Sequence, residues 1–120
     1  AFARAAAAID RAAAAEVPAS VRQLLPELLS HWDGRDPGLD TGWLAEPVAG
    51  LPLPDRPAGR LALLTAFASY RISGQQVADF RLARPADSAL LSLVSWAAMA
   101  AAQRIVSWIP VGSSDHRSNA

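Results

Sequence analysis

Three residues near the end of one predicted helix, Glu27, His31 and Asp33, have side chains that commonly ligate metal ions. Glu27 and His31 are four positions apart, so a helix would present both on one face. A metal site needs three or four converging ligands, and the only other histidine is His116, near the C-terminus. We therefore interpret the group as a surface pair near a helix C-terminus and expect no metal site.

Other reactive chemistry is limited by the residue types that are missing. The sequence has no cysteine, which excludes thiol catalysis, thiolate metal sites and disulfides within these residues. It contains no G-x-S-x-G turn that would present a nucleophilic serine, and no lysine for a phosphate-binding P-loop. No residue can be identified as a haem or flavin ligand, so no cofactor is expected.

Arginine and tryptophan offer binding chemistry instead. One buried arginine of the C-terminal half could hold an acidic substrate, although most such residues lie on solvated faces or in ion pairs. These arginines are Arg60, Arg71, Arg81, Arg84 and Arg104. The tryptophans are expected in the core or at a subunit interface, with a ligand-lining role as the alternative. They are Trp32, Trp43, Trp96 and Trp108.

Composition narrows the class of protein further. The 120 residues include 27 alanines, and 11 arginines balance 11 acidic residues to give no net charge. Such a charge balance gives no electrostatic basis for binding nucleic acid or an anionic membrane. The longest uncharged run, from Ser88 to Gln103, is 16 residues long, whereas a bilayer span needs about 20. We therefore expect a soluble, cytoplasmic protein of bacterial type with no membrane span.

The N-terminal third is predicted to form two helices. Alanine-rich residues 1–16 favour a first helix, held by a neighbour or a partner chain and ended by Pro18. Ser20 and Gln23 have the spacing of a capping box for the second helix, which Asp33-Gly34 closes. Pro26 lies inside this second helix, so the helix either kinks or restarts there.

Residues 33–59 contain five prolines and five glycines and show no sustained periodicity. A loop of this length inside a compact domain is unusual and is often functional. Asp40 to Glu46 could form one short helical turn that carries Trp43 and Leu44. The remainder is expected to cross the surface as an extended connection over residues 51–54.

Helical periodicity returns from Pro57 onward. A capping box of Ser73 and Gln76 is predicted to open a short helix with Val77 and Phe80 inward. Asp87 is expected to cap the last helix, which continues to Pro110. The predicted apolar face of that helix comprises Leu90, Leu91, Val94, Ala97, Ala98, Ala101 and Ile105.

No segment alternates as a half-buried strand does. The prediction is therefore one all-α domain over residues 1–110, with about five helices and the long loop at 33–59. A small, polar tail over residues 111–120 is expected to be disordered.

The segment from Leu61 to Ile109 resembles the carboxymuconolactone decarboxylase and AhpD-like alkylhydroperoxidase superfamily. The similarity lies in a hydrophobic helix ending near Ala68, a helix-opening turn at 69–76, and the stretch FRLARPADSALLSLVSWAAMAAAQRI at 80–105. That stretch has the family's ending of a helix, a short turn with aspartate and a long alanine-rich helix. The resemblance covers about 40% of the chain. It implies an AhpD-like helical fold that assembles as a homo-oligomer.

Peroxidase members of this family carry a C-x-x-C-x-x-x-H motif at the start of the helix that precedes this ending. Counting back from Asp87 places Ser69, Ile72 and Gln76 where the two cysteines and the histidine would be. These side chains can neither form a disulfide nor supply the base, so the resemblance implies a member without thiol peroxidase activity. Gln76 would then cap the helix that Ser73 opens.

The resulting hypothesis is a divergent, cysteine-free member that binds or transforms a small organic molecule, with acids as one candidate class. We expect its pocket near the 69–76 turn, where Ser69 or Tyr70 would orient the ligand and Arg71 would pair with a carboxylate. Gln76 completes this set of substrate-binding candidates, and no catalytic residue is assigned. The alternative is a non-catalytic helical subunit or interaction module, because nothing replaces the missing cysteines.

Overall fold

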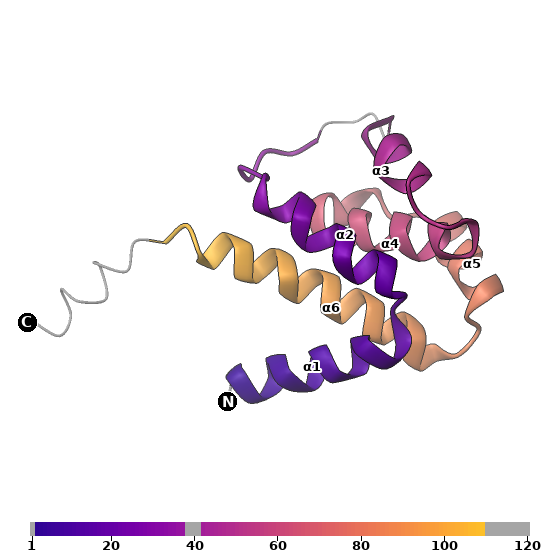
Figure 1. Ribbon diagram of the computed structural model, residues 1–120, viewed down its shortest axis with the longest axis horizontal. Coiled ribbons are helices and arrows are strands. Elements are labelled where there is room, and N and C mark those ends of the chain that lie inside the picture. Colours follow the sequence, from indigo (N-terminus) through magenta and orange to yellow (C-terminus); the bar gives the residue numbers. More distant parts are fainter. Residues whose placement is uncertain (1, 38–41, 110–120) are drawn as a thin grey trace, which may run out of the picture.

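The computed structural model describes residues 2–37 and 42–109, and over these residues its architecture is entirely helical (Figure 1). The α-helices are α1 (Phe2–Glu16), α2 (Ala19–Ser30), α3 (Ala45–Ala49), α4 (Arg56–Phe67), α5 (Gly74–Ala83) and α6 (Asp87–Val106). Three single-turn 3-10 segments are η1 (Gly42–Leu44), η2 (Leu53–Asp55) and η3 (Ser69–Arg71). The prediction of an all-α fold is confirmed. The tail expected to be disordered, 111–120, lies outside the described residues.

Helix α4 is the centre of the fold. It contacts α2, α3, α5 and α6, and seven of its twelve residues are buried. Leu61 and Leu64 have no exposed surface. A helix that is apolar around most of its circumference is a core helix. Because α4 is fixed by neighbours along its length, the side chains at its two ends are held in defined positions.

Helix α1 lies along α6 at the edge of the bundle (Figure 1). Ala13 is buried and Ile9 is half-buried, and the small alanine side chains permit close approach of the two helices. The C-terminal end of α1 is also tied down: the Arg84 guanidinium donates to the Glu16 carbonyl oxygen at 3.0 Å, and the Ser88 hydroxyl donates to the Glu16 carboxylate at 3.2 Å. The expectation that a neighbour holds this helix is therefore confirmed, and the neighbour is α6.

The start of α2 differs from the prediction. The helix begins at Ala19 with Pro18 as its N-cap residue, and Ser20 lies in the first turn. Proline suits a helix start because its ring presets a helical φ and its missing N–H would be unpaired there in any case. The Ser20 hydroxyl donates to Asp55 Oδ2 at 2.7 Å, so the predicted Ser20 capping box is wrong. Pro26 lies inside a continuous α2, so the helix does not restart at that residue.

The predicted N-cap of α5 is confirmed, whereas the predicted N-cap of α6 is wrong. The Ser73 backbone N–H donates to Gln76 Oε1 at 2.7 Å, which confirms the predicted capping box of α5. Asp87 does not cap α6, because it is already the first helical residue and Ala86 is the N-cap. The Asp87 carboxylate instead forms an ion pair with Arg81, near the positive end of the helix dipole.

The buried face of α6 is rotated from the predicted one. The buried residues are Ala89, Leu93, Trp96, Ala97 and Ala101. Leu91 and Ile105, which were assigned to the apolar face, are 69% and 46% exposed. The reason is that every residue of this helix between Asp87 and Arg104 is uncharged, so periodicity alone does not define its buried face.

The proline- and glycine-rich segment at 33–59 is more helical than predicted. Its described part contains η1, α3, η2 and the first residues of α4. The expected helical turn around Trp43 and Leu44 is confirmed, although residues 40 and 41 lie outside the described residues. The stretch expected to be extended, at 51–54, ends in the 3-10 turn η2. Leu44, Val48 and Leu51 are buried, which attaches the segment to the core.

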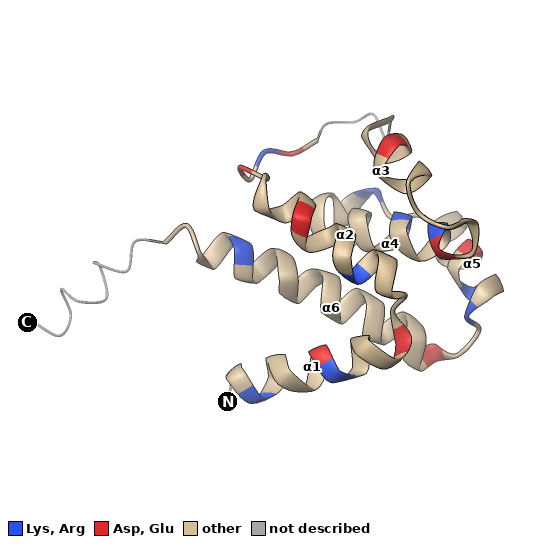
Figure 2. Ribbon diagram, in the orientation of Figure 1, with Lys and Arg blue, Asp and Glu red and all other residues tan. Residues whose placement is uncertain are grey.

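The surface carries both acidic and basic residues, and Figure 2 shows both on α1, α2, α5 and α6, whereas α3 has only an acidic residue and α4 only arginines. It also exposes apolar side chains, among them Leu82 at 86% and Leu91 at 69%. By length and composition, α6 is the one described helix that is apolar enough to cross a membrane. This is weak evidence for a span, because core helices pass the same test.

Candidate ligand-binding site

A cavity of about 300 Å³ opens between the end of α2, the η1–α3 segment and the end of α4. We call it the aromatic pocket. Its lining residues are Leu28, His31, Trp32, Arg35, Asp36, Pro37, Trp43, Pro47 and Phe67. Ligand pockets are typically apolar clefts of about 300–1,000 Å³ with a few polar groups for orientation. The cavity lies at the small end of this range.

Three aromatic side chains give the pocket its walls. The Phe67 ring packs edge to face against Trp32, with 5.0 Å between ring centroids, and against Trp43 at 5.9 Å. Such edge-to-face contacts are favourable because the positive edge of one ring meets the negative face of another. All three residues are half-buried. Each ring is therefore fixed by a neighbouring ring while part of its surface faces the cavity.

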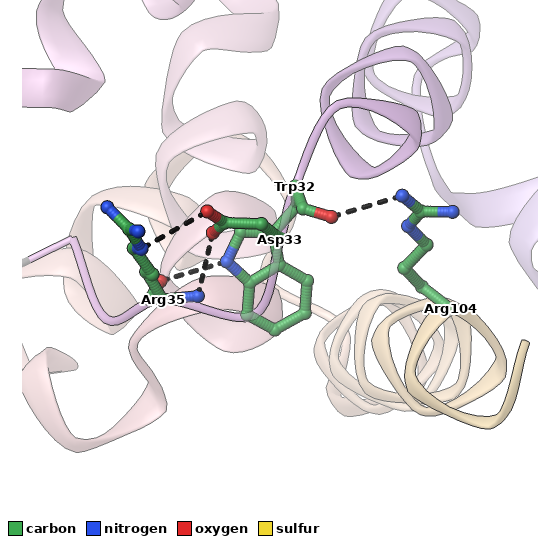
Figure 3. Close-up of polar contacts among 4 residues, drawn as sticks. All are labelled: Trp32, Asp33, Arg35 and Arg104. Carbon is green, nitrogen blue, oxygen red and sulfur yellow. Dashed lines mark hydrogen bonds and ion pairs between the residues drawn. The ribbon is translucent and has the colours of Figure 1, made fainter. Parts of the chain in front are cut away.

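Hydrogen bonds at the end of α2 hold Trp32 in place (Figure 3). Its indole N–H donates to the Arg35 carbonyl oxygen at 2.9 Å, and the Arg35 backbone N–H donates to Asp33 Oδ1 at 3.0 Å. On the opposite side, the Arg104 guanidinium donates to the carbonyl oxygens of Trp32 and Ser30, both at 3.1 Å. A cation there also stabilises the negative end of the α2 dipole. The tryptophan is thus fixed through both its side chain and its backbone.

The polar residues of the pocket lie at its rim, where His31, Arg35 and Asp36 are exposed. The Tyr70 hydroxyl donates to both carboxylate oxygens of Asp36, at 2.6 and 2.7 Å. This hydrogen bond raises the pKa of Tyr70 above its ordinary value of 10.0. Tyr70 follows the end of α4 and connects the η3 turn to the rim of the pocket.

The four predicted substrate-binding residues do not share one cavity. Tyr70 bonds to the rim of the aromatic pocket, Ser69 is exposed, and Arg71 is half-buried without lining that pocket. Gln76 lines a different cavity, beside α3 and the start of α4. Ser69 lies in η3, Ile72 in the connection and Gln76 in α5, so the three positions matched to the cysteine motif do not form one helix face.

Among the described residues, no cluster of three or more potential metal ligands occurs. His31 lies at the C-terminal cap of α2, as the sequence indicates, and lines the aromatic pocket. The pocket itself was missed because its walls come from three segments that are distant in sequence. The sequence offered one signal for this pocket, which was its tryptophans. We expected them in the core or at a subunit interface, and lining a ligand site was the alternative interpretation.

Comparison with known proteins gives one informative match. No family model and no solved structure matches the chain. An alkyl hydroperoxide reductase of Mycobacterium tuberculosis is 34% identical over 96 residues, which is 80% of this chain. The chain spans only 28% of that relative's length. With the all-helical fold, this similarity agrees with the resemblance in the sequence, and the chain belongs to the AhpD-like superfamily.

Proposed function

We propose that this chain is a divergent AhpD-like protein without thiol peroxidase activity, which binds a small organic molecule with an aromatic ring in the aromatic pocket. The observation that carries the proposal is the cavity walled by Trp32, Trp43 and Phe67. An aromatic ligand would bury its ring against these walls, and rim groups would orient its polar substituent.

The absence of thiol chemistry rests on the residue types. A peroxidatic cycle needs a thiolate to attack the peroxide and a second thiol to resolve the product, and the 120 residues contain no cysteine. The name alkyl hydroperoxide reductase describes the mycobacterial relative, of which this chain covers 28%. We expect the purified chain to consume no alkyl hydroperoxide in the presence of a dithiol reductant.

The polar residues at the rim of the aromatic pocket would orient the bound ligand. The Tyr70 hydroxyl donates to both oxygens of the Asp36 carboxylate, which would accept a further hydrogen bond from a ligand hydroxyl or N–H. The Arg35 guanidinium is paired with Asp33 at 3.2 Å, but both side chains are largely exposed, so this pair adds little rigidity. His31 contributes an imidazole to the same rim. We propose binding of the ligand and assign no catalytic step to these residues.

The test is calorimetric titration with 2-naphthol, a flat aromatic molecule with one hydroxyl. Trp43→Leu keeps an apolar side chain but removes one aromatic wall, and we expect affinity to fall by about tenfold or more. Trp96→Leu is the matched control, because Trp96 lines a separate cavity beside α6 and not the aromatic pocket, and a thermal unfolding curve verifies that the variant is folded. Equal binding by Trp43→Leu and the unmodified chain would contradict the proposal, as would the absence of any binding.

A second candidate function, a self-associating interaction module, is favoured by the seam between α1 and α6. Ile9, Leu91 and Ser95 are among the residues that line a shallow cavity there, and Leu91 is 69% exposed. Burying such a side chain against a second copy would stabilise a homo-oligomer. Both candidates are proposed for a bacterial, cytoplasmic protein.

Light scattering after size exclusion tests self-association. We expect the unmodified chain to be an oligomer and Leu91→Glu to be a monomer. Leu53→Glu is the control, because Leu53 is similarly exposed at 72% but lies in η2. A monomeric unmodified chain would refute this second candidate and leave ligand binding as the proposed function.

A further inference from the structure

A second cavity, of about 390 Å³, lies between α3, the first turns of α4 and the start of α5. We call it the arginine pocket. Its lining residues are Leu44, Ala45, Val48, Ala49, Arg56, Arg60 and Gln76. Leu44 and Val48 are buried and supply apolar surface. Arg56 and Arg60 are half-buried and one helical turn apart, so α4 presents both on the same side.

The two guanidinium groups differ in their partners. Arg56 Nε donates to the Leu51 carbonyl oxygen and Arg56 Nη2 to the Ala49 carbonyl oxygen, each at 3.0 Å. These bonds fix Arg56 against the backbone that follows α3. Within the described part of the chain, the Arg60 side chain has no hydrogen bond or ion pair. Its guanidinium is therefore free to bind a group that enters the cavity.

Gln76 adds a third donor. Its Oε1 accepts from the Ser73 backbone N–H at 2.7 Å in the capping box, which leaves the amide nitrogen as the unbonded end. None of the lining residues is acidic. Of the carboxylates on neighbouring segments, Asp55 accepts from Ser20 and Asp79 accepts from Gln75, both at 2.7 Å, and Glu46 of α3 lines a different cavity. The polar side chains of the pocket are thus donors without a facing carboxylate.

We propose that the arginine pocket binds the carboxylate of a small organic acid, with Arg60 as its principal partner. A guanidinium presents N–H groups in a planar fork that matches the two oxygens of a carboxylate. Partial burial strengthens this interaction relative to a fully solvated ion pair. The acid's short apolar chain would lie against Leu44 and Val48. Binding here does not depend on what occupies the aromatic pocket.

The proposal moves the expected carboxylate partner from Arg71 to Arg60. Both arginines are half-buried, but only Arg60 lines a cavity together with Gln76. The sequence predicted one binding site at the 69–76 turn for Tyr70 and Gln76, and the structure associates them with two different cavities. Tyr70 serves the rim of the aromatic pocket, whereas Gln76 serves the arginine pocket.

The test is titration of the full chain with pentanoate, followed by amide chemical shifts, alongside its neutral analogue pentanamide. We expect pentanoate to bind, with shifts centred on residues 44–49 and 56–60, and pentanamide to bind at least about tenfold more weakly. Arg60→Gln should lower the affinity for pentanoate by about tenfold or more. Arg60→Lys, which keeps the charge but loses the fork, should give an intermediate loss.

Arg11→Gln is the matched control, because it removes the same charge from an exposed position on α1. It should bind pentanoate as the unmodified chain does. A thermal unfolding curve for each variant verifies that it is folded. Equal affinity for pentanoate and pentanamide, or an Arg60→Gln variant that binds like Arg11→Gln, would overturn the proposal. Failure of pentanoate to bind the unmodified chain would also overturn it, and would leave the 2-naphthol experiment unaffected.

Discussion

The two ends of α4 present opposite chemistry. At its C-terminal end, Phe67 joins two tryptophans in the aromatic pocket, whereas at its N-terminal end Arg56 and Arg60 line the arginine pocket. The segment from η1 to α3 lies beside both, since Trp43 and Pro47 line the first cavity and Leu44 and Val48 line the second. One buried helix and one short segment thus position two cavities.

The difference lies in what each cavity would recognise. In our proposal, shape and ring contacts would select the ligand of the aromatic pocket, whose polar groups are confined to an exposed rim. Charge would select the ligand of the arginine pocket, where the donors are half-buried and no acidic residue lines the cavity. We propose that, in this chain of 120 residues without cysteine, the two ends of the central helix bind ligands by these two different kinds of contact.

The substitution with the largest expected effect on both pockets lies in the middle of α4. Leu64 has no exposed surface, and Leu64→Ala is expected to lower the free energy of unfolding by about 2–5 kcal/mol, because it leaves a cavity in the core. Both titrations should weaken together. Chemical denaturation measures the change, with Leu82→Ala, at an 86% exposed position, as the control. A loss at Leu64 no larger than at Leu82 would contradict the central role of α4.

Gly59→Ala should affect the two ends unequally. A methyl group at Gly59 would overlap Leu51 Cδ1, so the Leu51 side chain must shift, and overpacking of this kind costs about 1–3 kcal/mol. The carbonyl oxygen of Leu51 anchors Arg56, so pentanoate affinity should fall more than 2-naphthol affinity. Calorimetry with both ligands checks this expectation. An equal loss at the two pockets would show that they are not independently positioned.

A smaller, local effect is expected at Tyr70. Its hydrogen bond to Asp36 raises the pKa of the phenol, so the bond stabilises the fold at neutral pH and is lost as the pH rises through that raised pKa. Asp36→Ala should lower the pKa of Tyr70 toward its ordinary value of 10.0. Tyrosinate absorbance reports this cleanly, because the chain has one tyrosine. An unchanged titration would exclude the link between η3 and the rim.

The smallest effect should follow from Arg35→Ala. The ion pair of Arg35 with Asp33 spans 3.2 Å, but the two side chains are 88% and 62% exposed. Exposed pairs contribute less than about 1 kcal/mol, and the carbonyl oxygen that holds Trp32 is retained in the variant. Chemical denaturation and 2-naphthol titration should both be nearly unchanged. A large loss of 2-naphthol affinity would assign Arg35 a direct contact with the ligand.

The sequence predicted the helices better than their contacts. Strong periodicity located α2 and α4, and the capping box of Ser73 and Gln76 was correct because its partners are three residues apart. The Ser20 box failed because a tertiary partner, Asp55, takes the hydroxyl. The face of α6 could not be assigned, since apolar residues surround that helix and only packing against α1, α2 and α4 selects a side.

The candidate sites were less predictable for the same physical reason. The local pattern indicated a turn at 69–76, and in the structure Tyr70 bonds to the rim of one cavity whereas Gln76 lines another. The walls of the aromatic pocket come from Trp32, Trp43 and Phe67, whose rings meet only after α2, η1 and α4 have packed. The spacing of residues along the sequence does not indicate contacts that form only through tertiary packing.

The central claim is that α4 carries two independent binding sites of different chemistry. A crossed titration tests it most directly: 2-naphthol and pentanoate, each against Trp43→Leu and Arg60→Gln. We predict that Trp43→Leu loses 2-naphthol and keeps pentanoate, and that Arg60→Gln does the reverse. Loss of both ligands in either folded variant, or of neither ligand in both variants, would contradict the account.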